Sequence, residues 1–275
     1  MSPAPDPRLP ASVGSIGGGN MAEALLGGLL RAGMAPRQLL ASDPDPARRR
    51  HLEHALGVRT TESNAEVAGA SAFVVLCVKP GKLAEAAAGL PQGPGPLWLS
   101  ILAGQTLAVL QRRLGPGARV MRAMPNTPGL IGAGISALAD DPARAPGELA
   151  AAQAVLGALG EVVLVPEPLL DAVTGLSGSG PAYVFLFIEA LTRAGVREGL
   201  SADVSQQLAQ ATVLGAARLL RETGLPPALL RERVSSPGGT TLAGLAALAD
   251  AGFEDALGAA VHAATARSRQ LADPT

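Results

Sequence analysis

The sequence contains few cysteine, histidine and aromatic residues. Among its 275 residues there is one cysteine, Cys77, and three histidines, and 2% of the residues are aromatic. A single cysteine excludes an intramolecular disulfide and indicates a reducing compartment. Three histidines (His51, His54 and His262) are too few for a histidine-rich metal centre. We therefore expect no metal site.

Excess charge and long apolar runs are also lacking. The formal net charge of −1 leaves no electrostatic footprint for nucleic acid or for an anionic membrane. No segment has the uninterrupted apolar length of a membrane span, and residues 1–10 lack the apolar core of a signal peptide. We therefore expect a soluble, cytoplasmic protein with no nucleic-acid or membrane partner.

The spacing of apolar residues predicts an α/β domain over residues 11–165. Residues 1–10 are rich in proline and predict a disordered tail. Beyond them, short apolar runs alternate with helical patterns, which is typical of a doubly wound, mostly parallel sheet. The expected strands are 13–16, 39–41, 73–78, 97–101, 120–122 and 162–165, with helices such as 106–114 and 146–159 between them.

The pattern changes near residue 165, where we place the domain boundary. Residues 166–275 contain no convincing strand pattern and predict an all-helical domain. The expected helices are 180–196, 202–222, 226–233, 241–249 and 254–270.

A glycine-rich turn follows the first predicted strand and opens a helix. Gly17, Gly19 and Ala22 have the spacing of the dinucleotide fingerprint. Gly17 makes the turn, Gly19 lets a pyrophosphate approach, and the small Ala22 permits close packing of helix on sheet. The alternative is a plain tight turn, but the strand before it and the helix after it favour a dinucleotide site.

The end of the second strand leaves the choice of dinucleotide open. Asp43 lies where an acid would bind the ribose 2′-hydroxyl of NAD. Ser42 is adjacent, and the arginines at 48–50 are near enough in sequence to receive the 2′-phosphate of NADP. Those arginines also fit a solvated helix face, so the residues alone do not choose between the two cofactors.

Two further loops follow predicted strands, at the sheet edge where ligands bind. Lys79 precedes Pro80 after the strongest strand, and its amine has two open roles, reaching the cofactor or remaining in solvent. Asn126 lies between two prolines in a rigid loop. Its amide is suited to the ring or ribose end of a dinucleotide, and the alternative is an inert turn.

The segment from Val234 to Thr241 predicts an anion site between two helices. Pro237 fixes φ, while Gly238 and Gly239 allow a ligand to approach the backbone. Thr240 or Thr241 is expected to cap the helix that follows. The first amides of that helix would bind a carboxylate or phosphate, although an ordinary helix–turn–helix connection has the same composition.

Five of these segments resemble, in order, the signatures of the pyrroline-5-carboxylate reductase family. They are IGGGNMA at 16–22, VKP at 78–80, RAMPNTP at 122–128, LSGSGPAYVF at 176–185 and SSPGGTT at 235–241. The last two are specific, whereas the first is shared with many nucleotide enzymes. The resemblance implies an N-terminal Rossmann-type doubly wound sheet followed by an all-α C-terminal dimerisation domain.

The same resemblance implies a reaction and an assembly. Family members reduce the cyclic imine 1-pyrroline-5-carboxylate to L-proline with NADPH or NADH, and we expect NADPH to be preferred. The helical domain is expected to interleave with a second subunit, giving a homodimer or a higher homo-oligomer. Rival interpretations are another reductase of this architecture, such as an imine reductase or a 3-hydroxyacid dehydrogenase, and a dinucleotide-binding regulatory protein without catalysis. The absence of lysine from residues 166–275 counts against a hydroxyacid enzyme.

Site residues are carried over by matching these segments. Thr241 is implied as the catalytic hydroxyl, either a proton donor or a group that orients the substrate. The implied substrate contacts are Ser236, Pro237, Gly238, Gly239, Thr240 and Thr241. The implied cofactor contacts are Ile16, Gly17, Gly18, Gly19, Asn20, Met21, Ser42, Asn64, Cys77, Val78, Lys79, Pro80, Ile101, Leu102, Ala103 and Asn126.

Overall fold

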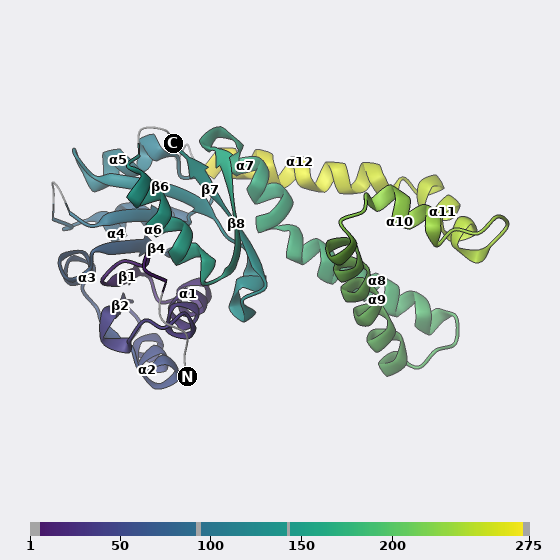
Figure 1. Cartoon of the computed structure of the whole chain (residues 1–275), viewed down its shortest axis with the longest axis horizontal. Helices are drawn as coiled ribbons and strands as arrows, with labels where there is room; N and C mark the ends of the chain where they lie inside the picture. The colour runs from purple at the N-terminus through teal and green to yellow at the C-terminus, as the bar shows by residue number, and fades with distance from the viewer. Residues whose placement is uncertain (1–5, 92–94, 142–143, 272–275) are drawn as a thin grey trace. The chain divides into compact units, whose positions relative to one another are not determined.

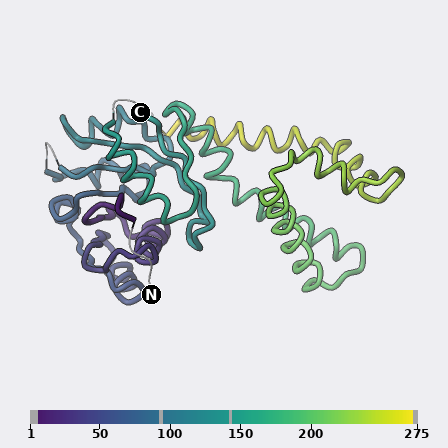
Figure 2. The backbone as a smooth tube through the Cα atoms, viewed as in Figure 1, coloured from purple at the N-terminus to yellow at the C-terminus, as the bar shows by residue number. Residues whose placement is uncertain are grey.

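The structure, a computed structural model, describes residues 6–91, 95–141 and 144–271. It divides into two compact units, which Figures 1 and 2 show. The first unit comprises Met1–Ser179 and His262–Thr275, and the second comprises Gly180–Val261. The chain therefore leaves the first unit once and returns to it within its last helix, at His262 (Figure 2).

The first unit is built on an eight-stranded sheet with the order β3-β2-β1-β4-β5-β6-β7-β8. All neighbouring strands are parallel except β6 and β7. The strand order reverses at β1, which pairs with β2 on one side and β4 on the other, and ligands bind at such a switch point. The strands are β1 Val13–Ile16, β2 Leu39–Ser42, β3 Arg59–Thr61, β4 Phe73–Leu76, β5 Leu97–Ser100, β6 Arg119–Met124, β7 Gly134–Asp140 and β8 Gly160–Pro166.

Helices cover both faces of this sheet, as Figure 1 shows. The strands are apolar on both sides, so successive residues enter different cores: Val75 packs with α1, α2 and α6, whereas Val74 packs with α3, α4 and α5. The α-helices are α1 Asn20–Arg31, α2 Pro46–Leu56, α3 Asn64–Ala70, α4 Leu83–Ala87, α5 Leu107–Leu114, α6 Pro146–Gly157 and α7 Leu170–Val173. Shorter helical turns are η1 Pro36–Gln38, η2 Pro80–Lys82, η3 Thr127–Ile131, η4 Glu167–Leu169 and the π-helix η5 Thr174–Gly178.

The structure differs from the predicted elements at two strands, the edge strand β3 and the internal strand β7, and at one strand end. Strands β3 and β7 were not predicted, because β3 is short and polar and β7 is rich in Gly, Ser and Ala, which have little strand preference. The strand predicted at 73–78 ends at Leu76, since Pro80 and the η2 turn follow closely.

The disordered tail predicted at 1–10 is wrong for its second half. The carboxylate of Asp6 accepts hydrogen bonds from the backbone and guanidinium of Arg8. Leu9 packs against the core of the first unit. The packing of the partly buried Leu9 side chain fixes this segment to the first unit, while residues 1–5 lie outside the described residues.

The second unit is helical, as predicted. It contains α8 Gly180–Arg197, α9 Ala202–Thr223, α10 Pro227–Arg233, α11 Thr240–Asp250 and the first part of α12 Phe253–Leu271. The rings of Phe187 and Phe253 join α8 to α12 with centroids 6.2 Å apart, and the Tyr183 hydroxyl donates to the Ala260 carbonyl oxygen. Tyr183, Phe187 and Phe253 therefore make contacts within the unit, whereas Phe185 is 61% exposed. No helix in the described part of the chain is long and apolar enough to cross a membrane.

The boundary between the compact units differs from the one predicted at residue 165. Residues 167–179 remain in the first unit, and so does the end of α12. The physical reason is a buried ion-pair cluster centred on Arg122 of β6, which binds Glu167 and Asp171 after β8. Asp171 in turn accepts a hydrogen bond from Ser268 of α12.

Candidate active site

The glycine turn at the end of β1 has a backbone that only glycine adopts without strain. Gly17 has φ +95°, and a Cβ there would lie 2.9 Å from the carbonyl carbon and oxygen of Cys77. Its amide donates to Ser42 O at 2.9 Å, and Cys77 N donates to Ile16 O at 2.8 Å. The turn is therefore fixed between the ends of β2 and β4, at the switch point of the sheet.

Gly19 leaves the start of α1 open. Nothing lies within 4 Å of a Cβ built on Gly19, which is the N-cap residue of α1 and has no side-chain cap. Asn20 and Gly19 are exposed, and Met21 is half-buried. Free amides at the start of a helix, beside an open glycine, fit the pyrophosphate of a dinucleotide.

Asp43, directly after β2, holds the glycine turn through its carboxylate. Its Oδ2 accepts from Gly18 N at 2.9 Å, and its Oδ1 accepts from Asp45 N at 2.9 Å. A Cβ on Gly18 would lie 3.2 Å from Oδ2. The acid is therefore in direct contact with the turn that is expected to receive the cofactor.

The two arginines that follow are engaged with the protein. Arg48 donates to the carbonyl oxygen of Gly18 and forms an ion pair with Glu23 of α1. Arg49 donates to the carbonyl oxygen of Asp43 at 2.7 Å. Both side chains are about four-fifths buried.

Ser42 and Asn64, two expected cofactor contacts, lie together. Ser42 is fully buried, and its hydroxyl donates to Asn64 Oδ1 at 2.7 Å. The amide nitrogen of Asn64 donates to Ala86 O at 3.0 Å. Both side chains therefore brace the loops after β2 and β3 against α4.

The loops after β4 and β5 place their residues at the same carboxyl edge of the sheet. Lys79 is exposed and Pro80 begins η2, while Val78 is half-buried. Burial raises the pKa of the Cys77 thiol to about 12, against a smaller opposing effect of a hydrogen bond with Ser15. After β5, Ile101 and Ala103 are half-buried, whereas the side chain of Leu102 lies inside the apolar core.

Asn126 links three segments through its side-chain amide. Its Oδ1 accepts from Ile135 N at 2.9 Å, and its Nδ2 donates to Ser177 Oγ at 3.4 Å. These bonds join η3, the start of β7 and η5. The structure thus gives this amide a bracing role in the loop after β6.

The turn at 235–241 belongs to the second unit and connects α10 to α11. Gly238 has φ +69°, and Gly239 N donates to Ser236 O at 2.9 Å. The expectation that Thr240 or Thr241 caps α11 is wrong: Gly239 is the N-cap residue, and the two threonines are the first residues of the helix. Because Gly239 has no side chain, the first amides of α11 receive no side-chain cap.

The exposure of this turn differs along its length. Ser236, Pro237, Gly238 and Thr240 are exposed, and Gly239 and Thr241 are half-buried. The Ser235 hydroxyl donates back to Arg231 O at 2.7 Å and so closes the end of α10. The turn therefore presents backbone amides and the Thr241 hydroxyl beside a helix start, which is the arrangement that an anionic ligand needs.

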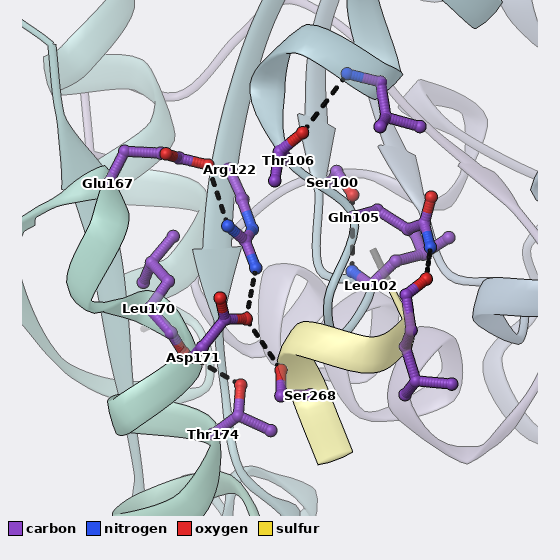
Figure 3. Close-up of polar contacts among 12 residues, drawn as sticks. Ser100, Leu102, Gln105, Thr106, Arg122, Glu167, Leu170, Asp171, Thr174 and Ser268 are labelled. Atoms are coloured by element: carbon purple, nitrogen blue, oxygen red, sulfur yellow. Dashed lines mark hydrogen bonds and ion pairs between the residues drawn. The ribbon is translucent and has the colours of Figure 1, made fainter. Parts of the chain in front are cut away.

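Sequence reasoning missed the cluster around Arg122, which Figure 3 shows. The Arg122 guanidinium binds Glu167 at 2.7 Å and Asp171 at 3.1 Å, and Asp171 accepts from Ser268 at 2.7 Å. Nearby, Gln105 Nε2 donates to the carbonyl oxygen of Leu271 at 2.8 Å. The available signal was the arginine at the end of the strand predicted at 120–122, since an arginine buried in a strand requires acidic partners.

Two protein-family models match this chain, one in its N-terminal part and one in its C-terminal part. Residues 167–271 match the family model described as pyrroline-5-carboxylate reductase dimerisation. Residues 12–104 match the one described as NADP oxidoreductase coenzyme F420-dependent. The second match covers the glycine turn and the ends of β2 and β4.

Relatives extend the match over nearly the whole chain. A pyrroline-5-carboxylate reductase of Synechocystis is 47% identical over 261 residues, covering 94% of this chain and 97% of that protein. The enzyme of Escherichia coli is 37% identical over 264 residues, covering 94% and 97%.

Solved structures show the same fold. A pyrroline-5-carboxylate reductase from Coxiella burnetii superposes with a TM-score of 0.85 at 32% identity, covering 96% of this chain and 99% of that chain. A Plasmodium falciparum pyrroline carboxylate reductase with NADP bound has a TM-score of 0.85 at 28% identity, covering 96% and 98%. The predicted fold class and the family resemblance are confirmed, and the chain belongs to the pyrroline-5-carboxylate reductase family.

Proposed function

We propose that this protein reduces 1-pyrroline-5-carboxylate to L-proline with NAD(P)H, the last step of proline synthesis. The observation that carries the proposal is 47% identity to a reductase of this name over 97% of that protein's length. The single cysteine fits a reducing compartment, and we propose the cytoplasm as the place of the reaction.

The first unit is proposed to bind the dinucleotide, which supplies the hydride when bound. Gly17, with its positive φ, and the open Gly19 fit the pyrophosphate, because a side chain at either position would distort the turn or occupy the space of the ligand. The proposed contacts are Ile16 to Met21 around the turn and the loops after β4 and β5, from Cys77 to Pro80 and from Ile101 to Ala103. Ser42 and Asn64 brace the loops after β2 and β3 through their hydrogen bonds, and Asn126 braces the loop after β6.

The turn at 236–241 is proposed to bind the substrate. A small ring that carries a carboxylate needs an anion pocket, and the uncapped amides at the start of α11 provide donors for it. Hydride attack on the imine carbon is faster when the imine nitrogen is protonated or accepts a hydrogen bond. We assign that role to the Thr241 hydroxyl, which is half-buried in the first turn of α11.

A homo-oligomer is proposed to form through the helical region. The match to a dimerisation model over residues 167–271 supports an oligomer. Large apolar side chains on α8 and α9 are exposed in the single chain, among them Phe185 at 61% and Leu214 at 60%. Such a surface is wider than isolated apolar residues on a monomer, and a second copy of the helical region would bury it.

The test is oxidation of NADPH, and of NADH in parallel, that depends on 1-pyrroline-5-carboxylate. Wild-type protein is expected to turn over, Thr241→Ala to lose about 100-fold in kcat, and Thr241→Ser to retain activity within about tenfold. Binding of the reduced cofactor, measured by its fluorescence, should be equal in all three proteins. No oxidation despite tight cofactor binding would reject the substrate and favour a non-catalytic binding protein. Full activity of Thr241→Ala would remove only Thr241 from the mechanism.

A further inference from the structure

We propose that Asp43 makes this enzyme select NADH over NADPH, by placing a carboxylate where the adenosine ribose of the cofactor binds. The inference rests on the proposed function, because it assumes that the glycine turn holds the dinucleotide. It also departs from the preference for NADPH that the family resemblance implies.

The position of the carboxylate is fixed by two backbone amides. Asp43 follows β2 directly, and its two oxygens each accept one amide, from Gly18 and from Asp45, at 2.9 Å. A carboxylate has about four acceptor positions, so about two remain. The remaining positions suit the 2′- and 3′-hydroxyls of a ribose whose pyrophosphate lies at the neighbouring glycines.

A 2′-phosphate at the same place would meet like charge. It adds nearly two negative charges within a few ångströms of the Asp43 carboxylate, and such repulsion is only partly screened in a half-buried loop. The phosphate also has no hydrogen to donate to the carboxylate when it is fully ionised. The site would therefore have to be neutralised by a nearby cation.

The two nearest arginines in sequence are already bound. Arg48 spans the Gly18 carbonyl oxygen and the Glu23 carboxylate. Arg49 lies against the carbonyl oxygen of Asp43 itself. Turning either guanidinium toward a phosphate would break contacts that hold the loop. The structure thus resolves the ambiguity for Arg48 and Arg49, whereas Arg50, the third arginine of the run, is exposed on α2.

The experiment measures binding without turnover. Isothermal titration calorimetry gives the affinity of the full-length protein for ADP-ribose and for 2′-phospho-ADP-ribose. The two ligands differ only by the 2′-phosphate, so the ratio of their affinities measures the preference at the adenosine ribose. We expect wild-type protein to bind ADP-ribose at least about tenfold more tightly. Asp43→Ser should abolish or reverse this ratio. Asp43→Asn, which keeps the size and an oxygen for the Gly18 amide, should reduce the ratio by removing charge alone.

Asp45→Ser is the matched control. Asp45 lies two residues away and caps α2 through its own side chain, a role that serine also fills. This variant loses the same charge and should keep the wild-type ratio. The kcat/KM ratio for NADH over NADPH with 1-pyrroline-5-carboxylate should follow the binding ratio in every variant.

The outcomes separate the two proposals. Tighter binding of 2′-phospho-ADP-ribose by the wild type, or a ratio unaffected by both Asp43 variants, overturns the role of Asp43 and leaves the reductase activity standing. Failure of both fragments to bind the wild type rejects the dinucleotide site, and the role of Asp43 with it. Tight fragment binding with no reduction of the imine rejects only the substrate.

Discussion

Removal of Asp171 should destabilise the first unit far more than its single contact to Arg122 suggests. Arg122 is 1% exposed in the middle of β6 and binds two carboxylates, those of Glu167 and Asp171. Asp171 also accepts the hydroxyl of Ser268 (Figure 3). In Asp171→Ala, the buried guanidinium of Arg122 therefore keeps only one of its two carboxylate partners, and the buried hydroxyl of Ser268 loses its acceptor.

The size of the effect follows from burial. Breaking a buried ion pair by removing one partner costs about 3–5 kcal/mol of unfolding free energy. Because Glu167 still pairs with Arg122, we expect the lower end, about 3 kcal/mol. Glu148→Ala is the control, since it breaks a pair on the same strand in which the Arg119 side chain is 49% exposed. That pair should contribute about 0–1 kcal/mol.

Urea unfolding followed by tryptophan fluorescence measures both variants. Trp98 is the only tryptophan and is buried in β5, the strand next to β6, so its emission reports the sheet that contains Arg122. All proteins are compared at one concentration, because association adds to stability. Replacing both partners, as Arg122→Met with Asp171→Leu, should recover part of the loss. Equal effects of Asp171→Ala and Glu148→Ala would refute the reasoning.

Two further predictions concern the glycine turn and the cysteine beside it. Gly17→Ala should weaken ADP-ribose binding by at least about tenfold, because a Cβ at φ +95° would strike the Cys77 carbonyl, whereas Gly69→Ala in α3 should bind normally. Intact ADP-ribose affinity in Gly17→Ala would contradict the placement of the pyrophosphate. The folded enzyme at pH 8 should react with iodoacetamide at least about tenfold more slowly than the urea-unfolded chain, since burial raises the pKa of Cys77 to about 12 and keeps the thiol protonated. Similar alkylation rates in the two states would show that the thiol is not shielded.

Strands buried on both faces were predictable from the sequence because burial requires continuous apolar runs. The run at Phe73 to Leu76 is such a case, and it lies at the centre of the sheet. Strand β3 at the sheet edge carries Arg59 and two threonines, so it has no apolar signal to detect. Strand β7 lies inside the sheet, but its small residues give no clear pattern, and its pairing with β8 decides its conformation.

The helices of the second unit were predictable for a different reason. Their apolar residues recur at helical spacing, and Ser201 and Gly224 mark the two ends of α9 as a cap and a left-handed terminus. The division into compact units was not predictable, because it depends on a contact between Asp171 and Ser268, 97 residues apart. Local patterns carry no information about such a pair.

In the candidate site too, the sequence predicts local backbone features but not the contacts that single side chains make. Spacing alone identified Gly17 and Gly19, because the backbone conformation and the open space at these positions are properties of glycine itself. The choice of cofactor depends instead on which of the arginines at 48–50 are free, and the partners of Arg48 and Arg49 come from α1 and from the backbone. A guanidinium near a site in sequence becomes a phosphate ligand only if no closer acceptor holds it. Here closer acceptors do, which is why Asp43 governs the ribose end in our proposal.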